Sequence, residues 1–169
     1  MSTFPSTPTG RVVTTGAGAR LVIERTFKAS IEDVWASLTE PDRLARWYGT
    51  LVGAARPGET VMVTMTAEED AVAEPARILA CDPPHRFVVE VGVQDPPWHL
   101  SVDLVETEGV TTMTFVQTLT DDVDVSDVGP GWEFYADRLT AALSGGVMPD
   151  WDADGYLDEL SPHYARQRP

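Results

Sequence analysis

The segment from residue 21 to residue 48 constrains the fold most, because it holds three secondary-structure elements in fewer than thirty residues. Residues 21–28 mix apolar and charged side chains, as a strand with one solvated face does. Ser30 stands where a helix N-cap belongs, with Asp33 three positions later, and so predicts a helix after it. Pro41 suits the first turn of a second helix, which Gly49 can end. A strand followed by two short helices points to a specific fold.

Five further stretches of the chain have β-strand patterns. Residues 85–93 alternate cleanly, with Phe87, Val89 and Val91 on one face. Residues 98–106 alternate apolar and polar side chains in the same way, and the remaining stretches are 60–67, 74–84 and 111–119. Turn residues separate neighbouring stretches, so the pattern predicts an antiparallel meander in which each strand is joined by a hairpin to the next.

A long amphipathic helix is predicted towards the C-terminus. From about residue 130 to residue 144, apolar side chains recur at i, i+3, i+4 and i+7, and Gly145 can stop the helix. A curved sheet and one such helix bury their apolar surfaces against each other. We therefore expect a flexible arm over residues 1–19, one domain over residues 20–146, and an extension with a short helix over residues 147–169.

Two motifs, one at each end of this domain, carry a family resemblance. The first is Ala29, Val34-Trp35, Thr39-Glu40-Pro41 and Trp47; the second is Gly131-Trp132 followed by Leu139 and Leu143. In these positions the chain resembles the START-like (SRPBCC, helix-grip) superfamily, in the branch related to the activator of heat-shock-protein ATPase. The chain departs from that pattern at Ser30 and Ile31, which replace prolines common before the first helix but still form a cap.

The resemblance implies an α+β helix-grip fold. Its parts are a curved antiparallel sheet of six to seven strands, two short helices after the first strand, and one long C-terminal helix packed across the sheet. In START-like proteins that packing leaves a cavity between the sheet and the long helix. A fold by itself does not show which reaction, if any, a protein catalyses.

Composition excludes several classes of partner. The chain has 169 residues, a hydrophobic fraction of 43% and a net charge of −15, which fits a single globular domain. Such a negative charge repels nucleic acid and anionic membrane surfaces. Cys81 is the lone cysteine, so no intramolecular disulfide can form. No apolar run has membrane-spanning length and no signal-peptide pattern opens the chain, so we expect a cytoplasmic protein.

An apolar pocket is the site that these residues favour. Small-molecule sites are mostly apolar with a few polar groups, and an amide such as Gln117 on an apolar strand face needs a partner. The same aromatic and apolar residues could equally be ordinary core. The candidate ligand-binding residues are Trp47, Tyr48, Trp98, Met113, Phe115, Gln117, Trp132 and Tyr135.

Catalytic residues are harder to find in this sequence. Neither a nucleophile–histidine–acid arrangement nor a phosphate-binding glycine loop is present. His99 and Asp103 share one face of their strand, opposite the apolar face. That alternation favours a solvated position for them. If the face instead lined the cavity, the two would form an acid–base pair.

The C-terminal extension contains a partial EF-hand loop. Asp150, Asp152, Asp154 and Asp158 occupy slots of the calcium-binding pattern, but Ser161 stands where a bidentate Glu belongs. The alternative is an acidic turn that begins a short helix. We therefore expect neither a metal nor another cofactor.

The leading functional hypothesis is a protein that binds a small hydrophobic molecule between the sheet and the long helix. One alternative is an enzyme of the polyketide cyclase/aromatase kind that uses the same cavity. Another is a co-chaperone-like interaction protein. Homodimerisation through the sheet or the C-terminal extension is a further hypothesis.

Overall fold

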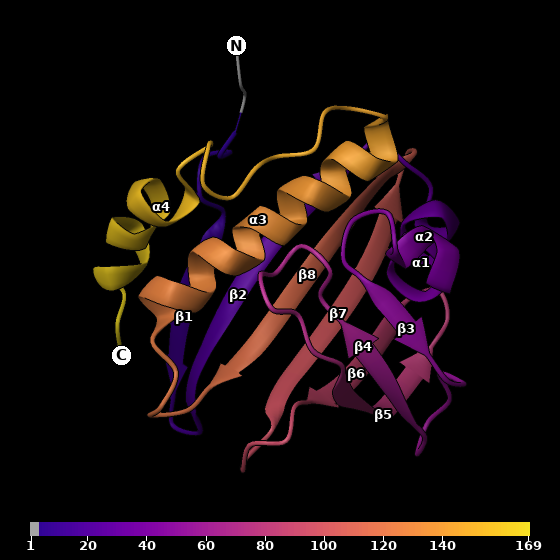
Figure 1. Cartoon of the computed structure of the whole chain (residues 1–169), viewed down its shortest axis with the longest axis horizontal. Helices are drawn as coiled ribbons and strands as arrows, with labels where there is room; N and C mark the ends of the chain where they lie inside the picture. Colours follow the sequence, from indigo (N-terminus) through magenta and orange to yellow (C-terminus); the bar gives the residue numbers. More distant parts are fainter. Residues whose placement is uncertain (1–3) are drawn as a thin grey trace.

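The computed structural model describes residues 4–169, which form an eight-stranded antiparallel sheet with helices against it (Figure 1). The sheet is curved and unclosed, and the long helix α3 crosses one of its faces. The strands are β1 (Gly10–Thr15), β2 (Gly18–Phe27), β3 (Thr50–Val52), β4 (Thr60–Thr64), β5 (Glu74–Asp82), β6 (Arg86–Val91), β7 (Trp98–Thr107) and β8 (Val110–Leu119). The helices are α1 (Ile31–Thr39), α2 (Pro41–Leu44), α3 (Val125–Ser144) and α4 (Tyr156–Ala165).

The strand order is β1-β2-β8-β7-β6-β5-β4-β3, and this confirms the α+β helix-grip fold. From β3 to β8 each strand pairs with the next, as the predicted meander requires. The first predicted strand, β2, does not pair with its successor: it pairs with β8, with Phe27 opposite Thr111. Helices α1 and α2 make this possible, because they carry the chain from β2, next to one edge of the sheet, to β3 at the opposite edge.

The N-terminal region differs from the expected arm. Residues 10–15 form β1, and β2 already begins at Gly18, so the sheet includes much of the segment 1–19. Val12 and Val13 are β-branched and favour a strand, although the surrounding Ser, Thr, Pro and Gly conceal the signal. Tertiary contacts then hold the segment, since the Glu133 carboxylate accepts hydrogen bonds from the backbone N–H groups of Thr9 and Gly10, each at 2.8 Å. Residues 1–3 lie outside the described residues.

The two short helices begin where the sequence predicts. The Ser30 hydroxyl caps α1 by accepting a hydrogen bond from the Asp33 N–H at 3.2 Å. Helix α2 starts at Pro41 but ends at Leu44, before the predicted stop at Gly49. A side chain at Gly49 would clash with the backbone, because a Cβ there would lie 1.7 Å from the Thr64 carbonyl oxygen. Glycine is therefore required where the helical segment meets β4.

Helix α3 starts five residues earlier than about residue 130, at Val125. Its N-cap is Asp124, whose carboxylate accepts from the Ser126 N–H at 2.9 Å. Pro130, at the predicted start, lies inside the helix instead. The helix ends as expected at Gly145, which adopts a left-handed conformation with φ 71°.

Helix α3 buries two different faces. On one side Tyr135 and Leu139 pack in the main hydrophobic core with residues of α1, β7 and β8. On the other side Glu133 and Asp137 are also buried, and both pair with Arg25 of β2, at 2.5 and 2.7 Å. A buried carboxylate is stable only with such partners.

The C-terminal extension docks on its own domain. Helix α4 packs against α3 and β1, and its Tyr156, Leu160 and Tyr164 are buried. The Tyr156 hydroxyl donates to Asp137 at 2.7 Å, and the Tyr164 hydroxyl donates to Glu133. Within residues 4–169, no helix is both long and apolar enough to cross a membrane.

Candidate functional site

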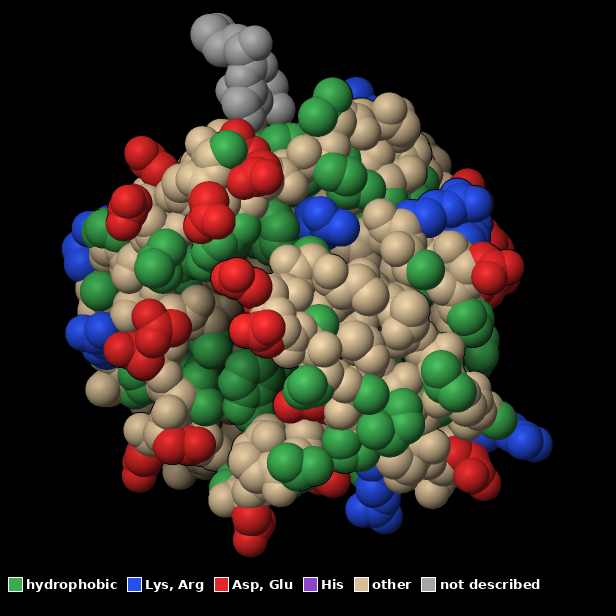
Figure 2. Space-filling view, viewed as in Figure 1, with side chains coloured by type: hydrophobic (Ala, Val, Ile, Leu, Met, Phe, Trp, Pro, Cys, Tyr) green, Lys and Arg blue, Asp and Glu red, His purple; other side chains and the backbone are tan. Residues whose placement is uncertain are grey.

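A largely apolar cavity of about 160 Å³ lies between the sheet and helices α1 to α3. Figure 2 shows a hollow with hydrophobic side chains on its floor and acidic side chains beside it. The walls come from every strand between β2 and β8 and from α3. Period-two alternation decides which side chains line it: Leu100 and Val102 of β7 do so, as do Met113 and Phe115 of β8.

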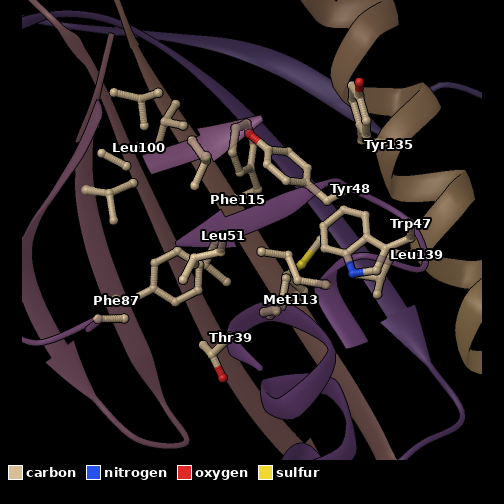
Figure 3. A pocket seen from close by; sticks show the side chains of 18 of the residues that line it. Thr39, Trp47, Tyr48, Leu51, Phe87, Leu100, Met113, Phe115, Tyr135 and Leu139 are labelled. Atoms are coloured by element: carbon tan, nitrogen blue, oxygen red, sulfur yellow. The ribbon is translucent and has the colours of Figure 1, made fainter. Parts of the chain in front are cut away.

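Aromatic rings form an arc along one side of the cavity (Figure 3). Ring centroids are 5.3 Å apart for Trp47 and Tyr48 and also for Tyr48 and Tyr135. The arc continues from Tyr135 to Trp132 at 6.3 Å and from Trp132 to Phe115 at 4.6 Å. These separations are typical of favourable aromatic pairs.

Hydrogen bonds fix the two tryptophans of this arc. The Trp47 indole N–H donates to the Ser37 carbonyl at 2.7 Å, and the Arg138 guanidinium donates to the Trp47 carbonyl at 2.7 Å. The Trp132 indole N–H donates to the Gln117 side-chain oxygen at 2.6 Å. The arc is therefore a preformed wall.

Few polar groups reach the cavity. The Tyr135 hydroxyl donates to the Glu68 carboxylate at 2.7 Å, which ties the loop over residues 65–73 to α3. The Tyr48 hydroxyl points towards Phe115 (Figure 3) and makes no hydrogen bond to any residue from 4 to 169. Burial raises the pKa of both tyrosines, and the nearby Glu68 carboxylate raises each pKa further. Both hydroxyls are therefore protonated at neutral pH and can donate hydrogen bonds.

Six of the eight candidate ligand-binding residues line the cavity: Trp47, Tyr48, Met113, Phe115, Trp132 and Tyr135. Trp98 and Gln117 do not line it: the Trp98 ring lies beside that of Trp132, and Gln117 accepts a hydrogen bond from Trp132. The Gln117 side-chain nitrogen is the one buried side-chain polar atom among residues 4–169 without a hydrogen-bond partner. A role for these residues in binding stays a prediction.

The suggested pair of His99 and Asp103 does not face the cavity. Leu100 and Val102 alternate with them on β7 and point inward, so the pair lies on the opposite face of the sheet. Asp103 pairs with Arg86 at 2.5 Å and is partly exposed to solvent. The sequence pattern favoured this outward position, and a catalytic role for the pair stays a prediction without support from the cavity geometry.

In the acidic turn of the C-terminal extension, the carboxylates accept hydrogen bonds from backbone N–H groups of the same turn. The Asp150 carboxylate accepts from the N–H groups of Asp152 and Ala153, and the Asp154 carboxylate accepts from the Asp150 N–H. Residues 4–169 contain no group of three or more side chains arranged to hold a metal ion. Asp158 lies beyond this turn, in the first turn of α4, where its negative charge interacts favourably with the helix dipole.

Two carboxylates near the cavity mouth were missed by the sequence reasoning. Glu68 accepts a hydrogen bond from Tyr135, which is 67 residues away in the chain, and no local sequence pattern predicts this contact. Glu74 could have been found by strand pairing: it lies directly opposite Val63, which lines the cavity, so it shares that face of the sheet.

Solved structures of similar shape show the same fold. CalU16 from Micromonospora echinospora is 22% identical, with a TM-score of 0.72 over 94% of both chains. The protein encoded by gene BPP1335 of Bordetella parapertussis is 21% identical, with a TM-score of 0.72 over 97% of this chain and 94% of that one. DynU16, from the dynemicin biosynthetic locus, is 21% identical, with a TM-score of 0.68 over 79% of this chain and 50% of its own. The comparison with curated proteins gives no match.

Family membership rests on the sequence itself. The family profile described as "Activator of Hsp90 ATPase homolog 1-like protein" matches residues 28–144, a range that runs from the end of β2 to the end of α3. This range includes both motifs that carried the resemblance and most of the cavity wall. The chain belongs to the activator of Hsp90 ATPase homolog 1-like family, within the START-like helix-grip superfamily.

Proposed function

We propose that this protein binds a small hydrophobic molecule in the cavity between the sheet and α3. The observation that carries the proposal is the cavity itself: an apolar space lined by side chains of the main hydrophobic core. Protein interiors ordinarily leave few voids larger than a water molecule, because each void forfeits packing contacts. A preformed apolar wall with a free tyrosine hydroxyl matches the usual chemistry of small-molecule sites.

The size of the cavity limits the apolar part of the ligand. An apolar cavity of roughly 150 Å³ takes up benzene. The cavity here has about the same volume, so it can enclose a ring-sized group without rearrangement. A larger ligand would extend through the mouth beside the 65–73 loop.

The two alternatives have less support. A cyclase-like enzyme would need an ionisable group at the cavity. With His99 and Asp103 outside, Tyr48, Tyr135 and the Cys81 thiol line the cavity, and Glu68 reaches it through its hydrogen bond with Tyr135. A co-chaperone would need a large exposed apolar surface. Tyr156, Leu160 and Tyr164 of α4 are buried in the chain's own core, and Leu157 is the large apolar residue of this helix that stays exposed. Cytoplasmic location stays part of the proposal, in keeping with the acidic composition.

Native mass spectrometry of freshly purified protein tests the proposal directly. A non-covalent adduct that disappears on denaturation would identify a ligand acquired during expression. Titration with uncharged 3-phenylpropanol, followed by tryptophan fluorescence and calorimetry, tests binding with a defined ring-sized probe. Trp47 and Trp132 line the cavity and would report occupancy.

A matched pair of variants locates the binding. Ala136 lines the cavity, whereas Ala142 of the same helix does not. Ala136→Leu should fill the space and weaken 3-phenylpropanol binding at least about tenfold, and Ala142→Leu should leave it unchanged. Equal binding by both variants and the parent protein would place the ligand elsewhere and contradict the proposal.

A further inference from the structure

Two carboxylates stand at the mouth of the cavity. Glu68, on the exposed 65–73 loop, accepts the hydrogen bond from Tyr135, which itself lines the cavity. Glu74 begins β5 and shares the inner face of the sheet with its cross-strand neighbour Val63. Both carboxylates lie close enough to the Tyr48 hydroxyl to raise its pKa, so they approach the same side of the cavity from different segments of the chain.

These carboxylates lack a cationic partner. Among residues 4–169, neither Glu68 nor Glu74 forms an ion pair, and no Lys, Arg or His lines the cavity. Arg138 lies near Tyr135, but its guanidinium is engaged by the Trp47 carbonyl at 2.7 Å and lies 5.5 Å from the centre of the Phe134 ring. The mouth thus carries a net negative charge beside an apolar interior.

The aromatic arc next to these carboxylates suits a cation. Aromatic faces carry partial negative charge, and several rings around one point form the usual recognition site for ammonium groups. Trp47, Tyr48 and Tyr135 are consecutive in the arc, with 5.3 Å between neighbouring ring centroids. The free Tyr48 hydroxyl can also accept a hydrogen bond from an ammonium N–H.

We infer that the cavity takes a ligand with a ring-sized apolar body and a protonated amine, with the ring inside and the ammonium group at the mouth between Glu68, Glu74 and the tyrosines. The inference rests on the proposed function and names the ligand class for the same site. Carboxylate ligands of equal size are rejected, because their charge would meet two carboxylates that have no cationic partner among the described residues.

Three probes of matched shape test this inference: 3-phenylpropylammonium, 3-phenylpropanol and 3-phenylpropanoate. Calorimetric titrations at pH 7 and low ionic strength should rank them in that order. The Kd of the ammonium probe should be at least about ten times lower than that of the carboxylate probe. The preference should shrink as salt is added, because salt screens charges at an open mouth.

Variants test whether the preference for the ammonium probe comes from Glu68 and Glu74 or from the net negative charge of the whole protein. Glu68→Gln removes one negative charge and keeps a side-chain oxygen that can accept the hydrogen bond from Tyr135. Glu74→Gln removes the second negative charge. Each should reduce the ammonium preference several-fold, and the double variant should bring it close to one. Glu159→Gln is the control, because it removes one charge from an exposed position on α4, which packs against α3 and β1. It should leave the preference unchanged, and thermal unfolding should show that all variants remain folded.

The outcomes separate this inference from the proposed function. If the alcohol binds and the carboxylate binds as tightly as the ammonium, the ligand class is wrong while the cavity remains a binding site. The ligand class is also wrong if Glu159→Gln lowers the preference as much as Glu68→Gln does. If none of the three probes binds, the proposed function fails for ring-sized ligands and the inference fails with it.

Discussion

Helix α3 separates two buried regions that differ in chemistry. Towards β1, β2 and α4, the carboxylates of Glu133 and Asp137 receive hydrogen bonds from Arg25, two tyrosine hydroxyls and the backbone of the N-terminal segment. Towards the other half of the sheet, the cavity is unfilled and the Tyr48 hydroxyl has no partner within residues 4–169. We call the first region the polar cluster.

The difference assigns distinct roles to the two sides of one helix. In the polar cluster every carboxylate oxygen is engaged, which fixes α3, α4 and the N-terminal segment relative to the sheet. A cavity costs packing energy, so it persists only where other parts of the fold hold its walls apart. The polar cluster therefore supplies the rigidity that an open cavity needs.

Removing the cation of the polar cluster should have the largest effect. Arg25→Met leaves two buried carboxylates without their cationic partner, a change that ordinarily destabilises a protein by about 3–5 kcal/mol. Urea unfolding followed by circular dichroism measures the free energy of unfolding. The control is Arg11→Met, which breaks the exposed pair with Glu24 and should cost no more than about 1 kcal/mol. Equal effects would mean that the polar cluster contributes no special rigidity.

Alkaline pH should reveal the buried tyrosines. Burial raises the pKa of Tyr156 and of Tyr164. The Asp137 carboxylate raises the pKa of Tyr156 further, and the Glu133 carboxylate does the same for Tyr164. Above about pH 10 the unfolded chain loses these protons while the folded chain keeps them. Stability is therefore fully present below that pH and falls as pH rises, by up to about 1.4 kcal/mol per pH unit for each tyrosine.

The phenylalanine variants sharpen this test. Tyr164→Phe removes a buried hydrogen bond to Glu133 and should lower stability at pH 7 by about 1–3 kcal/mol. It should also flatten the loss of stability between pH 10 and pH 11, measured by urea unfolding at each pH. A slope that stays as steep as in the parent protein would show that Tyr164 is not responsible for it.

Filling the cavity should change stability less than disturbing the polar cluster. Ala136→Leu adds methyl groups beside an existing space, so the free energy of unfolding should change by no more than about 1.5 kcal/mol. Ligand stabilisation should disappear in the same variant: thermal unfolding with saturating 3-phenylpropanol should no longer be shifted upward. A loss of several kcal/mol would instead mean that the cavity walls are tightly packed in solution.

The outer face of the sheet should respond least. Asp103→Asn removes the partly exposed pair with Arg86 and should alter stability by about 0–1 kcal/mol. Binding of 3-phenylpropanol should be unchanged in calorimetry, because Asp103 does not line the cavity. A clear loss of binding would overturn the assignment of the two sheet faces.

Local signals account for most of what could be predicted. The cap at Ser30, the proline at Pro41 and the glycine at Gly145 each mark an element boundary that the structure confirms. Period-two alternation identified the inward faces of β6, β7 and β8, and with them Met113 and Phe115 of the cavity wall. These features depend on neighbours within a few residues, so the sequence displays them directly.

Long-range partners account for what could not be predicted. Strand β1 pairs with its neighbour β2, but it also depends on Glu133 and on α4, more than a hundred residues away. Gln117 was expected at the ligand, but Trp132 covers it, and only the packing of α3 decides that. Glu68 reaches Tyr135 through a loop whose course no periodic pattern describes.

The sequence by itself therefore determined the family, the order of most elements and the apolar character of the site. Periodicity, caps and turn residues are properties of short segments, and short segments are read directly along the chain. The tertiary structure decided the role of the first nineteen residues, the pairing of Gln117 with Trp132, and the acidic mouth beside the aromatic arc. Each of these depends on which distant segments meet, because burial and charge pairing are set by three-dimensional neighbours.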